Sequence, residues 1–138
     1  MSYDIAVFES EAFLRGRDSF GDWFEARTQW GKRANDPTNA TPRLKTWFAE
    51  IAKAFPPMNG PNSPPFEDQE AWDRAVDYMF AGDMIYMSIS GIRGERAFAL
   101  VSKLATQIGV GVFALSDGGE IFVPTAEGKL DMVLQMFR

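Results

Sequence analysis

A run of prolines limits what this chain can form near its middle. Residues 56–65 contain five prolines, with Asn59, Gly60, Asn62 and Ser63 between them. Proline fixes φ and has no backbone N–H to donate, so this run cannot lie inside a helix or a strand. We expect a connecting loop. The alternative is a loop that contacts a partner, since loops often carry function.

The segment before the prolines has the clearest helical pattern in the chain. Thr41 suits the N-cap, and Pro42 suits the first helical position, where its missing N–H would have no partner. The spacing predicts an amphipathic helix over residues 41–55 that ends at Pro56. Five apolar side chains form its stripe: Leu44, Trp47, Phe48, Ile51 and Phe55.

Alternating and β-branched residues predict about five strands. Residues 3–8 form a first strand that ends at charged side chains. Residues 76–89 predict a hairpin with its turn at Gly82-Asp83, and residues 110–123 predict a second hairpin. Hairpins indicate a mainly antiparallel sheet.

Three more segments have helical spacing. One begins near Asp18, which suits an N-cap, and ends near Gly31. Another covers residues 93–108, with Gly109 placed as its C-terminal cap. The last is the tail, residues 125–138. Its apolar residues at helical spacing are Leu130, Val133, Leu134 and Phe137.

These elements, with a short helical turn near residues 70–75, predict an α+β fold in the order β-α-α-β-β-α-β-β-α. We expect about five strands, with the helices packed on one face of the sheet. The length fits a single domain over residues 1–138. A 46% hydrophobic composition supplies an ordinary core. We expect the aromatic residues at core-type spacing to be buried: Trp23, Trp30 and Trp47.

The chain contains neither histidine nor cysteine. This removes the commonest general base near neutral pH, thiolate nucleophiles, disulfides, and metal sites built on these residues. Ser-His-Asp and Cys-His catalysis are excluded as well. We therefore expect a protein that is not an enzyme and that uses no cofactor and no metal.

Acidic residues are concentrated after the proline run. The formal net charge is −5, and between residues 65 and 83 six acids accompany a single base, Arg74. This balance disfavours nucleic acid as a partner and would attract a basic protein surface. An aromatic residue among acids matches the anchor and charged rim of protein interfaces. The predicted partner-binding residues are Glu67, Asp68, Glu70, Trp72, Asp73, Asp77 and Asp83.

Other interpretations of these acids and of the glycines stay open. The acids could form a plain solvated surface, and they lack the ligand spacing of a calcium loop. Residues 90–95 could hold an anion at a helix start, with the help of Arg93. Residues 109–111 follow a helix and precede a strand, which is the wrong order for a dinucleotide fingerprint. A pocket near Arg93 and residues 56–65 is the alternative binding site.

The first residues of the sequence lack the basic and apolar regions of a signal peptide. No apolar run approaches the roughly 18 residues that a membrane helix needs. We therefore expect no membrane association and a cytoplasmic location.

Motifs spread over most of the chain, to about Pro124, carry a family resemblance. They lie at residues 2–8 (Ser-Tyr-Asp-Ile-Ala-Val-Phe), 41–48 (Thr-Pro-Arg-Leu-Lys-Thr-Trp-Phe), 55–61 (Phe-Pro-Pro-Met-Asn-Gly-Pro), 77–78 (Asp-Tyr), 85–86 (Ile-Tyr), 109–113 (Gly-Val-Gly-Val-Phe) and 119–124 (Gly-Glu-Ile-Phe-Val-Pro).

With these motifs the chain resembles a set of small bacterial proteins that look like immunity proteins. Such proteins are small cytosolic binders that neutralise a cognate toxin used between competing bacteria. The chain departs from them at Phe8 and Phe122, where tryptophan is usual, and at residues 91–94, where the helix start is usually more regular. No catalytic residues come with the resemblance.

The resemblance implies an immunity-type protein that neutralises a toxin by direct protein–protein contact, and the acidic segment would suit a basic toxin surface. One alternative is a small-molecule-binding domain or a small enzyme without histidine or cysteine chemistry. Another is a structural or assembly subunit, which self-association would support.

Overall fold

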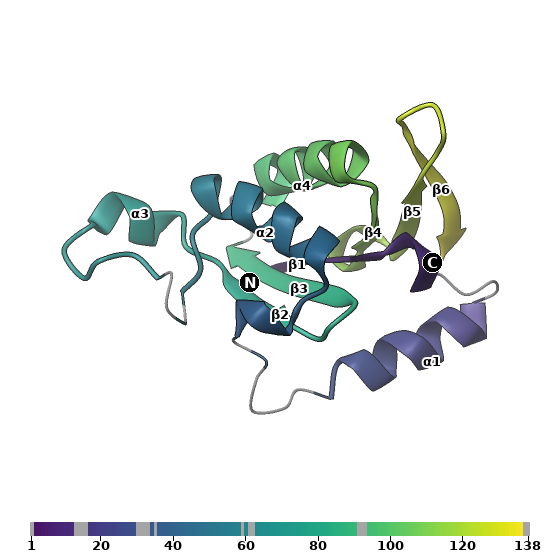
Figure 1. Cartoon of the computed structure of the whole chain (residues 1–138), viewed down its shortest axis with the longest axis horizontal. Helices are drawn as coiled ribbons and strands as arrows, with labels where there is room; N and C mark the ends of the chain where they lie inside the picture. The colour runs from purple at the N-terminus through teal and green to yellow at the C-terminus, as the bar shows by residue number, and fades with distance from the viewer. Residues whose placement is uncertain are drawn as a thin grey trace.

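A six-stranded antiparallel sheet forms the centre of the fold (Figure 1). The computed structural model describes residues 2–12, 17–29, 34, 36–58, 60, 63–90 and 94–136. Across the sheet, the strands follow one another as β2 (Asp77–Phe80), β3 (Met84–Ser90), β1 (Ser2–Glu9), β4 (Val110–Ala114), β5 (Glu120–Pro124) and β6 (Leu130–Gln135).

Strand β1 lies inside the sheet and is buried on both of its faces. It pairs with β3, with Ser2 opposite Ser90, and with β4, with Ala6 opposite Phe113. Four consecutive apolar residues are at most 1% exposed: Ile5, Ala6, Val7 and Phe8. A strand that is apolar on both sides needs cover on both sides.

Two helices cover one face. Helix α2 (Pro42–Ala54) and helix α4 (Gly94–Ile108) pack on the side chains that β1 directs to this face, Ile5 and Val7. Trp47 of α2 is fully buried there. The amphipathic patterns therefore predicted both helices and the faces that they bury.

Helix α1 (Arg17–Arg27) covers the opposite face, where Phe20 and Trp23 pack against Ala6 and Phe8 of β1. Figure 1 shows α1 on the far side of the sheet from α2 and α4. The expectation that the helices lie on one face is therefore wrong. Strand β1 directs apolar side chains to both faces of the sheet, and each face needs a helix to bury them.

The helix ends agree with the sequence in part. Pro42 begins α2, but the hydroxyl of its N-cap residue, Thr41, donates to the carboxylate of Glu9 and accepts no hydrogen bond from the helix backbone. Helix α1 starts one residue before Asp18, which is therefore not its N-cap. Gly109 has φ of +91° and ends α4 as predicted.

The predicted burial of the tryptophans is confirmed for Trp23, which is 9% exposed, and for Trp47. Trp30 and the predicted helix stop at Gly31 lie outside the described residues.

The tail is a strand, not a helix. Strand β6 pairs with β5, and the register passes over Val133, which lies at a bulge. The turn between the two strands is closed by a 2.7 Å bond from the amide of Thr125 to the carbonyl of Lys129, with Gly128 at φ of +76°. Pairing with β5 thus overrides the local helical spacing. Phe137 lies outside the described residues.

The two predicted hairpins are present as β2–β3 and β4–β5. The described residues also form four short helical elements: η1 (Ser10–Ala12), η2 (Pro37–Asn39), α3 (Gln69–Asp73) and η4 (Leu115–Asp117). Of these, α3 is the helical turn expected near residues 70–75.

Candidate functional site

The turn before α3 and α3 itself project from one end of the molecule (Figure 1). We call residues 65–73 the acidic projection. Asp68 caps α3, since its Oδ1 accepts from the amide of Ala71 at 3.1 Å. The ring Nε1 of Trp72 donates to the carbonyl of Pro65 at 3.0 Å. These local bonds shape the projection without a large buried face.

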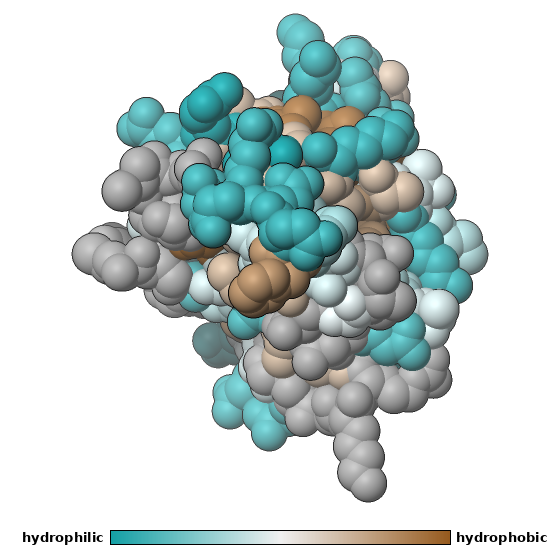
Figure 2. Space-filling view, turned by 90° about the vertical axis from the view of Figure 1, so that its left-hand side faces the viewer, coloured by the Kyte–Doolittle hydropathy of each residue, from teal (hydrophilic) through white to brown (hydrophobic). Residues whose placement is uncertain are grey.

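The acidic projection presents an apolar side chain among acids. Phe66 is 94% exposed. Its ring is apolar, so its contact with water is unfavourable. Figure 2, which views this end of the molecule, shows an apolar area bordered by hydrophilic residues. The exposed acids of the projection are Glu67, Asp68, Glu70 and Asp73.

The base that follows the projection is turned towards the body of the protein. Nη1 of Arg74 donates to the carbonyl of Ala54, the last residue of α2, at 2.7 Å. A cation at a helix C-terminus is favourable, because the terminal carbonyls carry partial negative charge. Arg74 therefore anchors the projection to α2 instead of neutralising its acids.

The sequence pointed to Trp72 as the aromatic anchor, whereas the structure exposes Phe66. Trp72 is half-buried and its ring N–H is already bonded to Pro65. The sequence signal that could have identified Phe66 is its position between a proline and an acid, outside any apolar period.

Two of the predicted acids lie apart from the projection. Asp77 is the half-buried first residue of β2, and Asp83 lies in the turn beyond the other end of that strand. Asp83 accepts from Nε and Nη2 of Arg27 at 2.6 and 3.1 Å. This pairing with Asp83 raises the pKa of Arg27, and the two hydrogen bonds tie α1 to the β2–β3 turn. The structure thus brings together Glu67, Asp68, Glu70, Trp72 and Asp73.

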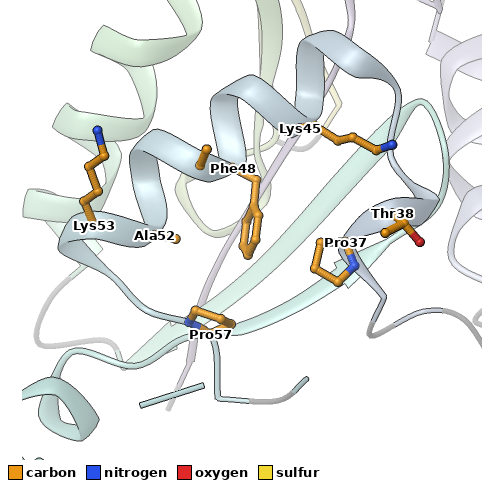
Figure 3. Close-up of a pocket in the computed structure, with 8 residues that line it drawn as sticks. Pro37, Thr38, Lys45, Phe48, Ala52, Lys53 and Pro57 are labelled. Carbon is orange, nitrogen blue, oxygen red and sulfur yellow. The ribbon is translucent and has the colours of Figure 1, made fainter. Parts of the chain in front are cut away.

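A second surface feature is an apolar groove along α2 (Figure 3). It has a volume of about 460 Å³. The ring of Phe48 lies at its base, between Pro37 of η2 and Pro57 of the proline run. We call this the α2 groove, and its lining residues are Pro37, Thr38, Lys45, Phe48, Ala49, Ala52, Lys53 and Pro57.

The walls of the α2 groove are fixed by the sheet below it. Phe48 is 5% exposed and packs edge-on against Tyr78 and Phe80, with ring centroids 5.0 Å away in each case. Val76 donates its amide to the carbonyl of Pro56 at 2.8 Å, which holds the first prolines of the run beside β2. The start of the proline run is therefore a wall of a groove.

The tyrosines do not replace histidine as a general base near neutral pH. Burial raises the pKa of Tyr78 far above its usual value. Burial, and then hydrogen bonds to Asp117 and Asp4, raise the pKa of Tyr3 and of Tyr86 respectively. These phenols are therefore held in the neutral form at neutral pH, where they are poor bases.

The glycines of the alternative sites have packing roles. A Cβ at Gly111 would lie 2.4 Å from Cζ of Phe8, and one at Gly94 would lie 2.6 Å from ring carbons of Tyr3.

Arg93 and the neighbouring residues 91–92 lie outside the described residues. A smaller pocket of about 280 Å³ is lined by Ala54, Phe55, Arg74, Arg96 and Leu100.

Within the described ranges, no group of three or more acidic side chains is arranged to hold a metal ion. In the same part of the chain, no helix combines the length and apolar character needed to cross a bilayer.

Comparison with protein-family models, curated proteins and solved structures found no significant match.

Proposed function

We infer that this chain is a protein-binding module of the immunity type, which neutralises a cognate toxin by direct contact through the acidic projection. The observation that carries this proposal is the 94% exposure of Phe66. Binding-energy hot spots are apolar or aromatic anchors that enter a pocket on the partner while surrounding residues exclude water. Phe66 has the position of such an anchor.

The charges of the projection suit a basic partner. Four exposed acids lie within residues 67–73, and Arg74 is bonded to Ala54 instead of to any of them. Complementary charge mainly accelerates encounter and excludes wrong partners, and its effect is screened by salt. A toxin that acts on nucleic acid or on another anionic substrate would offer such a basic surface.

The experiment is recovery of the tagged chain from the cells that encode it, with partners identified by mass spectrometry. The co-purifying toxin is then produced, and its activity is measured with and without the chain. We expect the wild-type chain to abolish that activity. We expect Phe66→Ala to weaken binding by about 30-fold or more, the effect of losing a hot spot.

A double charge reversal, Glu70→Lys with Asp73→Lys, should weaken binding and flatten its salt dependence. Glu127→Lys is the matched control, because Glu127 is an exposed acid in the β5–β6 turn, far from α3 (Figure 1). If no toxin is recovered, or if a recovered toxin binds these variants as it binds the wild type, the proposal is wrong.

A further inference from the structure

The α2 groove and the acidic projection are complementary surfaces on the same chain. The groove is apolar at its base and has Lys45 at one end and Lys53 at the other (Figure 3). The projection carries an exposed Phe66 followed by Glu67 and Asp68. Each surface therefore has what the other lacks, namely an apolar side chain to fill the groove and acids to meet its lysines.

The groove is large enough for the projection. A cavity of about 150 Å³ holds a benzene ring. The α2 groove, at about 460 Å³, has room for the ring of Phe66 and for part of the prolines before it, Pro64 and Pro65. Rings and prolines pack well together, because both are rigid and lose little conformational entropy on binding.

Charge favours the same occupant. Among the described residues, Lys45 has no ion-pair partner, and Figure 3 shows its side chain extending along the groove wall near Thr38. Lys53 is paired with Glu50, with Nζ to Oε2 at 3.0 Å. Lys45 is thus the cation that an incoming carboxylate would meet.

We propose that the acidic projection of one copy docks in the α2 groove of a second copy, with Phe66 between Pro37 and Pro57. Because the two contacting surfaces differ, the contact is head-to-tail. Each copy offers one projection and one groove, so successive copies add to form a closed ring or an open filament. The proposal does not depend on the toxin. If both proposals hold, the toxin and the groove of a second copy compete for the same projection, so an excess of toxin should disperse the self-association.

The experiment uses two variants that each remove one half of the contact. Phe66→Ala removes the anchor but keeps the groove. Ala49→Glu keeps the anchor and blocks the groove, because residue 49 is exposed, lines the groove, and lies four positions from both Lys45 and Lys53. A glutamate there pairs with these lysines and repels the incoming acids.

Sedimentation velocity at protein concentrations up to about 1 mM tests the contact. We expect the wild type to self-associate and each variant alone to have a dissociation constant raised by about 10- to 100-fold, the value of burying one phenylalanine. An equimolar mixture of the variants should form a dimer and nothing larger, since it contains one intact groove and one intact projection per pair.

Met132→Ala is the matched control for loss of exposed apolar surface, because Met132 is 57% exposed on β6. It should associate like the wild type. Circular dichroism confirms that each variant is folded. In a labelled Phe66→Ala sample, the NMR signals of Phe48 and Ala52 should shift when unlabelled Ala49→Glu is added.

Three results would overturn the proposal: a wild type that stays monomeric at every concentration, a Phe66→Ala variant that associates as the wild type does, or a mixture that does not dimerise. Insertion of Phe66 into the groove of its own chain would leave every sample monomeric and is therefore excluded by the expected result. None of these outcomes depends on whether a toxin is found.

Discussion

Helices α2 and α3 are joined by the proline run, yet they are held in place by different forces. Helix α2 has 13 residues and buries four large side chains, among them Trp47 at 0% exposure. Helix α3 has five residues, and its one buried side chain is Ala71. A helix this short is not stable alone, so α3 depends on its cap and on the bonds of Trp72 and Arg74.

The difference shows how one chain separates stability from recognition. Leu44, Trp47 and Ile51 of α2 are directed into the core, where they cannot reach a partner, whereas Phe48 of the same helix also lines the α2 groove. The apolar side chains of the acidic projection contribute little to the core and stay available, as expected for binding segments, which belong to the less stable parts of a fold.

The largest effect on stability is expected for Trp47, and Trp72, on the other side of the proline run, is its comparison. Trp47→Ala should lower the free energy of unfolding by about 3–5 kcal/mol, because it leaves a cavity in a closed core. Trp72→Ala, at a half-buried position, should cost about 1 kcal/mol. Urea unfolding followed by circular dichroism measures both. Equal losses would mean that α3 belongs to the core as much as α2 does.

The free energy of unfolding should fall at alkaline pH because of Tyr78, which is bonded to the end of α2. Tyr78 is buried and donates to the carbonyl of Phe55 at 2.7 Å, and its pKa is raised by burial. The unfolded phenol ionises near pH 10 while the folded one stays neutral, so stability is complete below about pH 10 and falls above it by up to about 1.4 kcal/mol per pH unit. Unfolding at pH 9 to 11 should show this slope.

Tyr78→Phe is the control for that slope. It should lose the part of the pH dependence that comes from Tyr78, while Tyr3 and Tyr86 keep their own smaller parts, since their pKa values are also raised. Parallel stability curves for the wild type and the variant between pH 9 and 11 would show that Tyr78 ionises equally in both states.

Loss of the hydrogen bond between Arg74 and the end of α2 should have a smaller effect on stability. Arg74→Ala removes the 2.7 Å bond to Ala54 and should lower the free energy of unfolding by about 1.5 kcal/mol, the lower end of the range for a hydrogen bond of a charged group. Arg74→Lys keeps a donor at the end of α2 and should recover part of the loss. Thermal unfolding compares the three proteins, and an unchanged Arg74→Ala midpoint would contradict the assignment.

The smallest global effect is expected at the cap of α3. Asp68→Ala removes the bond to the amide of Ala71, which should cost about 1 kcal/mol within α3 and less than about 0.5 kcal/mol for the whole protein. Hydrogen exchange at Ala71 should accelerate several-fold while the exchange of core amides stays unchanged. Asp68→Asn, which keeps a cap acceptor, should behave like the wild type. Loss of global stability equal to that of Arg74→Ala would contradict this prediction.

The parts of the fold that sequence periodicity predicted are those with strong local patterns. Helices α2 and α4, strand β1 and both hairpins follow from the apolar spacing and from turn glycines such as Gly82. Strand β6 did not follow, because Leu130 and Leu134 fit a helix equally well by spacing. Pairing with strand β5 is what makes this segment a strand. The bulge at Val133 breaks the alternation that would have indicated a strand from the sequence.

The candidate site was predicted in part. The sequence grouped all seven predicted residues on one face, and the structure keeps five of them together on the acidic projection. It could not separate Asp83 from them, because the pairing with Arg27 depends on how α1 packs. It also could not reveal the exposure of Phe66 or the α2 groove, since both depend on the path of the chain around Pro57.

The central place of β1 has a consequence for how the protein is made. Its first neighbour pairs Ser2 with Ser90, and its second pairs Ala6 with Phe113. A ribosome adds about 5–20 residues per second, so β1 leaves it several seconds before either neighbour exists. During that interval a strand with four consecutive buried apolar residues has no native partner. Nascent chains of this protein should therefore engage chaperones early, and release them once β4 has been synthesised.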